Sequence, residues 1–328
     1  MLNILPVKST PYPTLRSCID DCIQSVAEWQ GKDSKYMYGN AWQFSFKQQR
    51  SSEQSIIDRV STPRISKEYL AAYHGINFTY INREEPAMDK SFLLEMLEKR
   101  LAGGMPVLVG FDSYSCPWCL AYRRLHTSHA CLAVGVDRSS RKIYLTDGYY
   151  GRPLETVDLD EWESACHFFA EFSLCEPSRP LGQWRLALEH TLLNQEHEVQ
   201  PLQVAEHLRA YADAYLETGI IAENPEEYSA YFLLAANTLP ITRIRYSLFL
   251  SAISADQEVP ELTRIAEGYR IAGEMWNMVN QFMIKVMRSG NKPAQRGKIH
   301  KKMLEIIHSE EELLLELVQL VNQPAFKS

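Results

Sequence analysis

The hydrophobic pattern divides the chain near residue 180 into a mixed first half and a helical second half. In the first half, apolar residues at helical spacing predict helices over 17–30, 66–74 and 91–102. Compact apolar runs predict strands over 106–111, 129–136 and 142–147. A short polar segment separates the last two runs and predicts a hairpin, so we expect an α+β fold here.

The second half is expected to be an all-α bundle, because nearly every segment after residue 183 has helical periodicity. Helices are predicted over 183–195, 201–218, 226–238, 241–254, 260–288 and 298–322. The longest of them repeats apolar residues at alternating three- and four-residue steps, which is typical of helices that pack on other helices. Its antiparallel partner is expected to follow a turn at 290–297.

A linker is predicted at 176–182, where two prolines and a glycine interrupt the pattern. The 328 residues of the chain are enough for two domains of ordinary size. We therefore predict an α+β domain over 1–178 and a helical domain, with long antiparallel C-terminal helices, over 183–328.

The composition is that of a soluble globular protein, with 45% hydrophobic and 23% charged residues. A net charge of −7 argues against a general nucleic-acid binder, and no apolar run is long enough to span a membrane. The N-terminal apolar run is too short for a signal peptide, and the seven cysteines lack the spacing of a disulfide framework. These features predict a cytoplasmic protein with free thiols.

Cys18 stands at the start of the first predicted helix, where a thiol is most easily ionised. Ser17 followed by Asp20 resembles a capping box, so Cys18 is expected to be the first helical residue. Unpaired backbone N–H groups and the helix dipole favour a thiolate at that position. The position also fits a small buried residue, so a purely structural role stays open.

His129 opens the first strand of the predicted hairpin, and Asp147 ends the second. If the turn centres on Ser139, Cys131 pairs with Asp147, and His129 becomes its diagonal neighbour on the same face. A slip of one residue would place His129 and Asp147 on opposite faces. A cysteine nucleophile, a histidine base and a carboxylate that orients the base together perform cysteine acyl transfer. Taken singly, the histidine and the aspartate also fit structural roles.

The first half contains five segments whose order and spacing match a known family. They are 18–31, 38–44, 106–112, 129–137 and the strand that closes on Asp147. In these segments the chain resembles the N-terminal domain of the butirosin biosynthesis protein H family, which has a papain-like cysteine fold. The helical second half, with 271–276 in its long helix, also resembles the region after that domain in the family.

The resemblance implies that an acyl or peptidyl group passes from a phosphopantetheine thioester to an amine or to water. The thioester would be carried by a carrier protein or a nonribosomal peptide synthetase, so the protein would bind no cofactor of its own. By resemblance, Cys18 is the acyl-accepting nucleophile, His129 the general base and acid, and Asp147 its orienter. Ser17 departs from the histidine that often precedes the nucleophile, and the usual upstream glutamine has no counterpart here.

Six further residues are predicted to bind substrate: Asp112, Tyr114, Trp118, Arg123, Arg124 and Trp42. Tyr114 and Trp118 would form a wall of the acyl pocket. The two arginines would contact the phosphopantetheine phosphate or the carrier surface. Asp112 occupies a family-like position at a strand end, and Trp42 lies in one of the matching segments.

Cys116 and Cys119 form a CxxC motif, which allows two other interpretations. With His126 and His129 it gives a zinc-like spacing, although the gap between the pairs is shorter than in zinc fingers. A thioredoxin-like redox role would require a helix directly after the motif, and none is predicted. We therefore expect a loop without metal.

Basic residues gather around the turn between the last two predicted helices: Lys285, Arg288, Lys292, Arg296, Lys298, Lys301 and Lys302. A solvated hairpin tip explains them in the simplest way. They could also dock an acidic carrier protein by electrostatic steering.

These features together predict a cysteine-dependent acyltransferase or thioesterase of natural-product biosynthesis. Two other functions stay open, a cytoplasmic papain-like peptidase and a non-catalytic binding module. The exposed side of the long helices also leaves a homodimer open.

Overall fold

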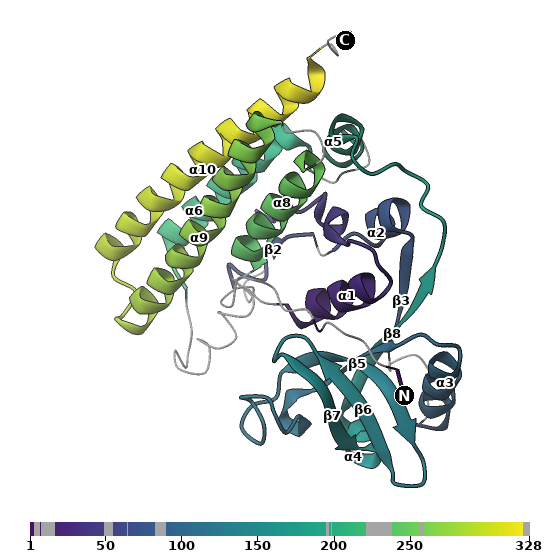
Figure 1. The fold of residues 1–328 in the computed structure, drawn as a ribbon. Coiled ribbons are helices and arrows are strands. Elements are labelled where there is room, and N and C mark those ends of the chain that lie inside the picture. Colours follow the sequence, from purple (N-terminus) through teal and green to yellow (C-terminus); the bar gives the residue numbers. More distant parts are fainter. Residues whose placement is uncertain are drawn as a thin grey trace. The chain divides into compact units, whose positions relative to one another are not determined.

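The computed structural model describes residues 1–2, 7, 17–48, 55–63, 65–82, 90–194, 197, 199–220, 238–255 and 259–323. The chain forms two compact units (Figure 1). The α+β unit comprises residues 1–34 and 70–179, and the helical unit comprises residues 35–69 and 180–328. Residues 35–69, which were predicted to lie in the first domain, thus belong to the helical unit. Within the described ranges, no helix is sufficiently long and apolar to cross a membrane.

The α+β unit is built on a six-stranded antiparallel sheet with the strand order β3-β8-β4-β5-β6-β7. Its strands are β3 (Ile76–Asn82), β4 (Val107–Asp112), β5 (Ser128–Asp137), β6 (Lys142–Asp147), β7 (Arg152–Asp158) and β8 (Cys166–Leu174). The three predicted strands are confirmed as β4, β5 and β6. Strands β3, β7 and β8 were not predicted, and β8 inserts between β3 and β4.

Helices cover both faces of this sheet. They include α1 (Cys18–Trp29), α3 (Lys90–Ala102) and α4 (Leu159–Ala165), while α2 (Lys67–His74) precedes β3. The three predicted helices are confirmed as α1, α2 and α3, each within one residue at either end. Helix α4 was not predicted.

Helix α1 lies on the sheet face opposite the one that carries His129. Its Cys22 Sγ is 3.8 Å from the carbonyl oxygen of Ala130 on β5. Cys131, the next residue of β5, packs instead into a core that includes residues of α3 and α4. Because side chains alternate along a strand, Ala130 faces away from His129 and Cys131. Figure 1 shows α1 and α4 on opposite sides of the strands.

The helical unit contains the long helices that the sequence predicted. Its elements are η2 (Lys35–Tyr38), β1 (Ser45–Phe46), β2 (Val60–Ser61), α5 (Trp184–Leu192), η4 (Pro201–Gln203), α6 (Val204–Thr218), α8 (Thr238–Ser254), α9 (Pro260–Arg288) and α10 (Pro293–Asn322). The apolar seam of α9 is buried along its whole length: Leu262, Ile265, Tyr269, Ala272, Trp276, Val279, Met283 and Val286.

Several boundaries in the helical unit differ from the prediction: α5 ends at Leu192 rather than at residue 195, the first residues of 201–218 form η4 before α6, and α8 begins at Thr238 rather than at residue 241. Helix α10 begins at Pro293 rather than at residue 298, because proline suits the first turn of a helix and Gly297 is accommodated inside it. The predicted helix over 226–238 lies outside the described residues except for Thr238, which begins α8.

Candidate functional site

His129 and Asp147 form a buried pair in the hairpin of β5 and β6. Beside the turn Asp137 pairs with Lys142, one residue off the pairing predicted from a turn centred on Ser139. A bulge between Ala133 and Gly135 then shifts the register so that Leu132 pairs with Thr146, which brings Cys131 opposite Asp147. His129 Nε2–H donates to Asp147 Oδ2 over 2.8 Å. Only 6% of His129 and none of Asp147 is exposed. The predicted proximity of the imidazole and the carboxylate is therefore confirmed.

Asp147 is held from two further directions. The indole Nε1–H of Trp118 donates to Oδ2 over 2.6 Å, and the backbone N–H of Tyr150 donates to Oδ1 over 3.2 Å. Burial acts to raise the pKa of Asp147, but the hydrogen bond and charge of His129, with the bond from Trp118, lower it overall. The carboxylate is thus fixed in its charged form and sets the orientation of His129.

Three thiols surround the imidazole of His129. Cys116 and Cys119 lie in the connection between β4 and β5, and their sulfur atoms lie within 4.8 Å of each other and of a His129 ring nitrogen. Cys131 follows on the same face of β5, within 4.8 Å of His129 and Asp147. All three thiols are free and buried. The sequence placed Cys131 opposite Asp147 without assigning it a role, and it grouped Cys119 with His129 only in the zinc-like alternative.

The thiols differ in how readily they ionise. Hydrogen bonds from the Cys116 thiol and from His129 lower the pKa of Cys119 to about 6, against the effect of burial. Burial raises the pKa of Cys131. Burial also opposes the charge on His129, but the charge of Cys131 and the bond to Asp147 raise the pKa of His129 well above its usual value. Cys119 and His129 are therefore the pair most easily converted to thiolate and imidazolium.

Cys18 begins α1 as expected. The Oγ of Ser17 accepts a hydrogen bond from the Asp20 backbone N–H at 3.4 Å and donates to the Asp20 carboxylate at 2.8 Å. The thiol of Cys18 is partly exposed. In the part of the chain that the structure describes, it makes no hydrogen bond to His129. The structure therefore confirms the helix start, and it places Cys18 near enough to act electrostatically on Cys131, the thiol beside His129 and Asp147.

The predicted substrate-binding residues of the β4–β5 connection lie near one another. Asp112 accepts from the backbone of Tyr114 at 3.0 Å and from His126 Nδ1 at 2.5 Å. Tyr114 stacks on His126 with ring centroids 4.4 Å apart. Arg123 lies over the Tyr114 ring at 5.6 Å. His126 is thus engaged at the surface and does not join Cys116 and Cys119.

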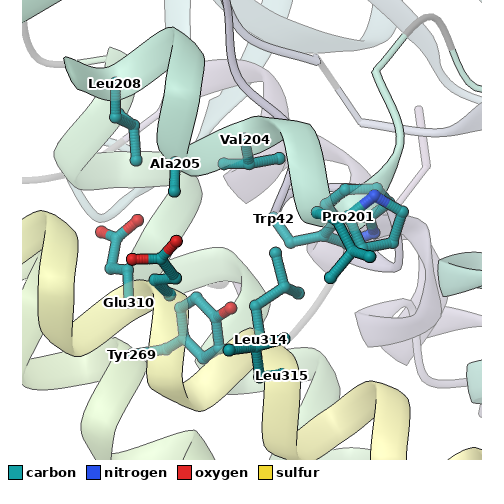
Figure 2. A pocket seen from close by; sticks show the side chains of 11 residues that line it. Trp42, Pro201, Val204, Ala205, Leu208, Tyr269, Glu310, Leu314 and Leu315 are labelled. Carbon is teal, nitrogen blue, oxygen red and sulfur yellow. The ribbon is translucent and has the colours of Figure 1, made fainter.

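Three of the predicted substrate residues, Arg123, Arg124 and Trp42, differ in their surroundings. Arg123 also pairs with Glu161 at 2.8 Å, whereas Arg124 is exposed. Trp42 belongs to the helical unit, where its indole N–H donates to the carbonyl of Thr191 over 3.1 Å. Figure 2 shows Trp42 beside Pro201 in a pocket lined only by residues of that unit. Trp42 therefore serves the packing of the helical unit.

Comparison with known proteins adds nothing to this geometry. No model of a known protein family matches the chain, and no match to a curated protein was found. The likeness to the butirosin biosynthesis protein H family stays a prediction, and a function can be inferred only from the residues themselves.

Proposed function

We propose that the α+β unit is a papain-like, cysteine-dependent acyltransferase or thioesterase acting on phosphopantetheine thioesters. The observation that supports this proposal best is the buried 2.8 Å hydrogen bond from His129 Nε2–H to Asp147. It fixes the tautomer and orientation of the ring and leaves Nδ1 for proton exchange with a thiol. A thiol, an imidazole and a carboxylate in this order are the groups that cysteine acyl transfer requires.

Two thiols are candidates for the acyl acceptor. Cys18 is proposed because it is the first residue of a capped helix and is partly exposed. Cys119 is the second candidate because its sulfur contacts the His129 ring and its pKa is lowered to about 6. A nucleophile works best within hydrogen-bond reach of its base, which favours Cys119 in the present geometry.

In the proposed reaction, His129 takes the proton of the cysteine thiol, and the sulfur attacks the carbonyl carbon of the thioester. The bond between that carbon and the phosphopantetheine sulfur breaks. That sulfur leaves as a thiol with the proton that His129 returns, and the acyl group stays on the enzyme as a new thioester. An amine or a water molecule then attacks this thioester, which yields an amide or an acid and restores the cysteine.

The proposed donor is a carrier protein or a nonribosomal peptide synthetase, and the proposed acceptor is a small amine, the acyl chain itself or water. Thioesters suit this site because they are easier acyl donors than amides for a moderately activated thiolate. The exposed Arg124 and the arginine beside Tyr114, Arg123, are proposed to contact the phosphate of the incoming phosphopantetheine.

The test uses the octanoyl thioester of N-acetylcysteamine, which imitates the end of phosphopantetheine. We expect intact-protein mass spectrometry to show one octanoyl group per chain, and peptide mapping to locate it on Cys18 or on Cys119. The variants Cys18→Ala and Cys119→Ala then identify the acceptor, and Cys175→Ala serves as a control because Cys175 is exposed and outside this cluster. Labelling that is unchanged in His129→Gln, or that falls only on other cysteines, would refute the proposal.

A further inference from the structure

Cys116, Cys119 and His129 bring three metal-binding atoms to one place in the α+β unit. These donor atoms lie within 4.8 Å of one another, and all three residues are buried. We propose that these three residues, the zinc ligands, bind a zinc ion. This would be a function beyond the acyl transfer proposed above.

The donor set suits zinc better than other abundant cations. Two thiolates and an imidazole are soft or borderline ligands, which zinc accepts and which magnesium and calcium avoid. With zinc–sulfur bonds of about 2.3 Å and zinc–nitrogen bonds of about 2.0 Å, tetrahedral donors lie roughly 3.3–3.8 Å apart. The donor atoms of the zinc ligands already lie within 4.8 Å, so a modest contraction brings them into range.

The surroundings of His129 match those of a metal-binding histidine. Such a histidine donates its second ring N–H to a carboxylate, which fixes the ring for the metal. Here Nε2–H donates to Asp147, so Nδ1 is the nitrogen left for the ion. Trp118 and the backbone of Tyr150 hold that carboxylate in turn, which completes an outer shell around the site.

The chain brings the two thiols to His129 through a tight turn. The backbone N–H of Cys119 donates to the carbonyl of Cys116 over 3.0 Å, so both side chains leave the same turn. This turn lies in the connection that joins β4 to β5, and His129 is the second residue of β5. A bound ion would therefore tie the connection to the sheet and stabilise the folded state.

This ligand set differs from the zinc-like spacing in the sequence. His126, the first histidine of that pattern, donates to Asp112 and is exposed, so it is not available as a ligand. Three protein ligands leave one tetrahedral position for water or another small ligand. Zinc would occupy the His129 nitrogen that acyl transfer needs, so the two activities exclude each other on the same molecule.

The test uses the full chain, kept reduced with a phosphine, stripped with a chelator and dialysed. We expect elemental analysis to show one zinc ion per chain after reloading, and cobalt to give a thiolate-to-metal charge-transfer band. The double variant Cys116→Ser/Cys119→Ser should lose the band. Asp147→Asn should keep it but bind cobalt roughly 10- to 100-fold more weakly, because the outer-shell carboxylate is lost.

The control is Cys175→Ser, which removes a free exposed cysteine and should bind zinc as the unmodified protein does. Far-ultraviolet circular dichroism reports whether each variant folds, and the cobalt band of the unmodified protein tests the site even if a variant does not. The proposal is overturned if the unmodified protein shows no thiolate band, or if the double variant retains it. Acyl labelling is measured separately, so failure of one proposal leaves the other standing.

Discussion

Each unit buries a pair of oppositely charged side chains, and the two pairs differ in what surrounds them. In the helical unit, Arg243 on α8 pairs with Glu310 on α10, and their side chains are 0% and 4% exposed. In the α+β unit, His129 pairs with Asp147, with side chains 7% and 0% exposed. The two pairs are therefore almost equally buried, and they differ in the side chains that surround them.

In the helical unit, further hydrogen bonds engage both Arg243 and Glu310. Arg243 Nε–H donates to both Glu310 oxygens at 3.0 Å, and Trp276 Nε1–H donates to one of them at 2.7 Å. A second guanidinium nitrogen reaches the carbonyls of Ala41 and Gln43 at 3.4 Å. An arginine does not give up its proton in proteins, so this arrangement can only hold the helices together.

In the pair of the α+β unit, the second ring nitrogen of His129 can still exchange a proton. Asp147 accepts hydrogen bonds from Trp118 and Tyr150, and the imidazole of His129 lies beside the Cys119 thiol, whose pKa is lowered to about 6. The comparison teaches that two pairs of similar burial can differ in chemistry, because the imidazole of His129 has a second nitrogen that can exchange a proton and the guanidinium of Arg243 does not give up its proton. Four predictions test this distinction.

The largest effect is expected from His129→Gln. General acid–base catalysis contributes roughly 10²- to 10⁴-fold to a rate, and glutamine cannot exchange a proton with a thiol. The rate of octanoyl labelling, followed by mass spectrometry over time, should fall by that factor. Arg243→Met, studied under conditions where it stays folded, should label at the normal rate. Equal losses in both variants would show that the two pairs have the same structural role.

Arg243→Met should instead destabilise the helical unit by about 3–5 kcal/mol, because it leaves the charge of the buried Glu310 carboxylate uncompensated, with only the hydrogen bond from Trp276 remaining. Urea unfolding followed by far-ultraviolet circular dichroism measures this loss. The double variant Arg243→Met/Glu310→Leu removes both charges and should recover most of the stability. A double variant as unstable as the single one would mean that the pair contributes packing rather than charge balance.

Cys119 should react with iodoacetamide at lower pH than an ordinary thiol. Its pKa is lowered to about 6, so alkylation should rise as pH increases through about 6 rather than through about 8.5. Peptide mapping of metal-free protein at several pH values measures this, with Cys175 as the internal reference. His129→Gln should move the Cys119 midpoint upward, because one donor to the thiolate is lost. If Cys119 and Cys175 had the same pH midpoint of alkylation, the lowered pKa of Cys119 would be contradicted.

The local parts of the site could be predicted from the sequence. Alternation of apolar residues predicted the hairpin, and His129 does lie beside Asp147. A turn centred on Ser139 does not by itself give that register, however: Asp137 pairs with Lys142, and a bulge between Ala133 and Gly135, which the sequence did not predict, shifts the pairing by one residue. The cap at Ser17 was predictable because Asp20 follows at the required spacing. Each of these depends on residues close together in the chain or joined by one short turn.

The long-range parts could not be predicted in this way. Cys119 reaches His129 because the β4–β5 connection folds back on the sheet, and no periodic pattern marks such a return. Cys131 was placed opposite Asp147 from the sequence, and its position two residues after His129 on the same strand face also indicates that it lies beside the imidazole. Trp42 was assigned to the site because its segment resembled the family, but residues 35–69 pack with the helical unit. The missed strand β8 pairs with partners far away in the sequence.

The smallest expected effect, and the most local test of the comparison, concerns the hydrogen bond from Trp118 to Asp147. Trp118→Phe keeps an aromatic ring and removes the N–H donor. We therefore expect the free energy of unfolding to fall by about 1.5–3 kcal/mol, the usual contribution of a hydrogen bond to a charged group.

The same bond also affects unfolding in acid. Because the pKa of Asp147 is lower in the folded than in the unfolded protein, the carboxylate stabilises the fold at pH values above its unfolded-state pKa. This contribution is lost as the pH falls through the folded-state pKa. Loss of the donor raises that folded-state pKa, so the variant should unfold in acid at a higher pH. Trp162→Phe is the matched control, because its buried indole N–H has no hydrogen-bond partner among the described residues. If both variants shift the acid midpoint equally, packing rather than the bond to Asp147 sets it, and Asp147 is held less firmly than its contacts indicate.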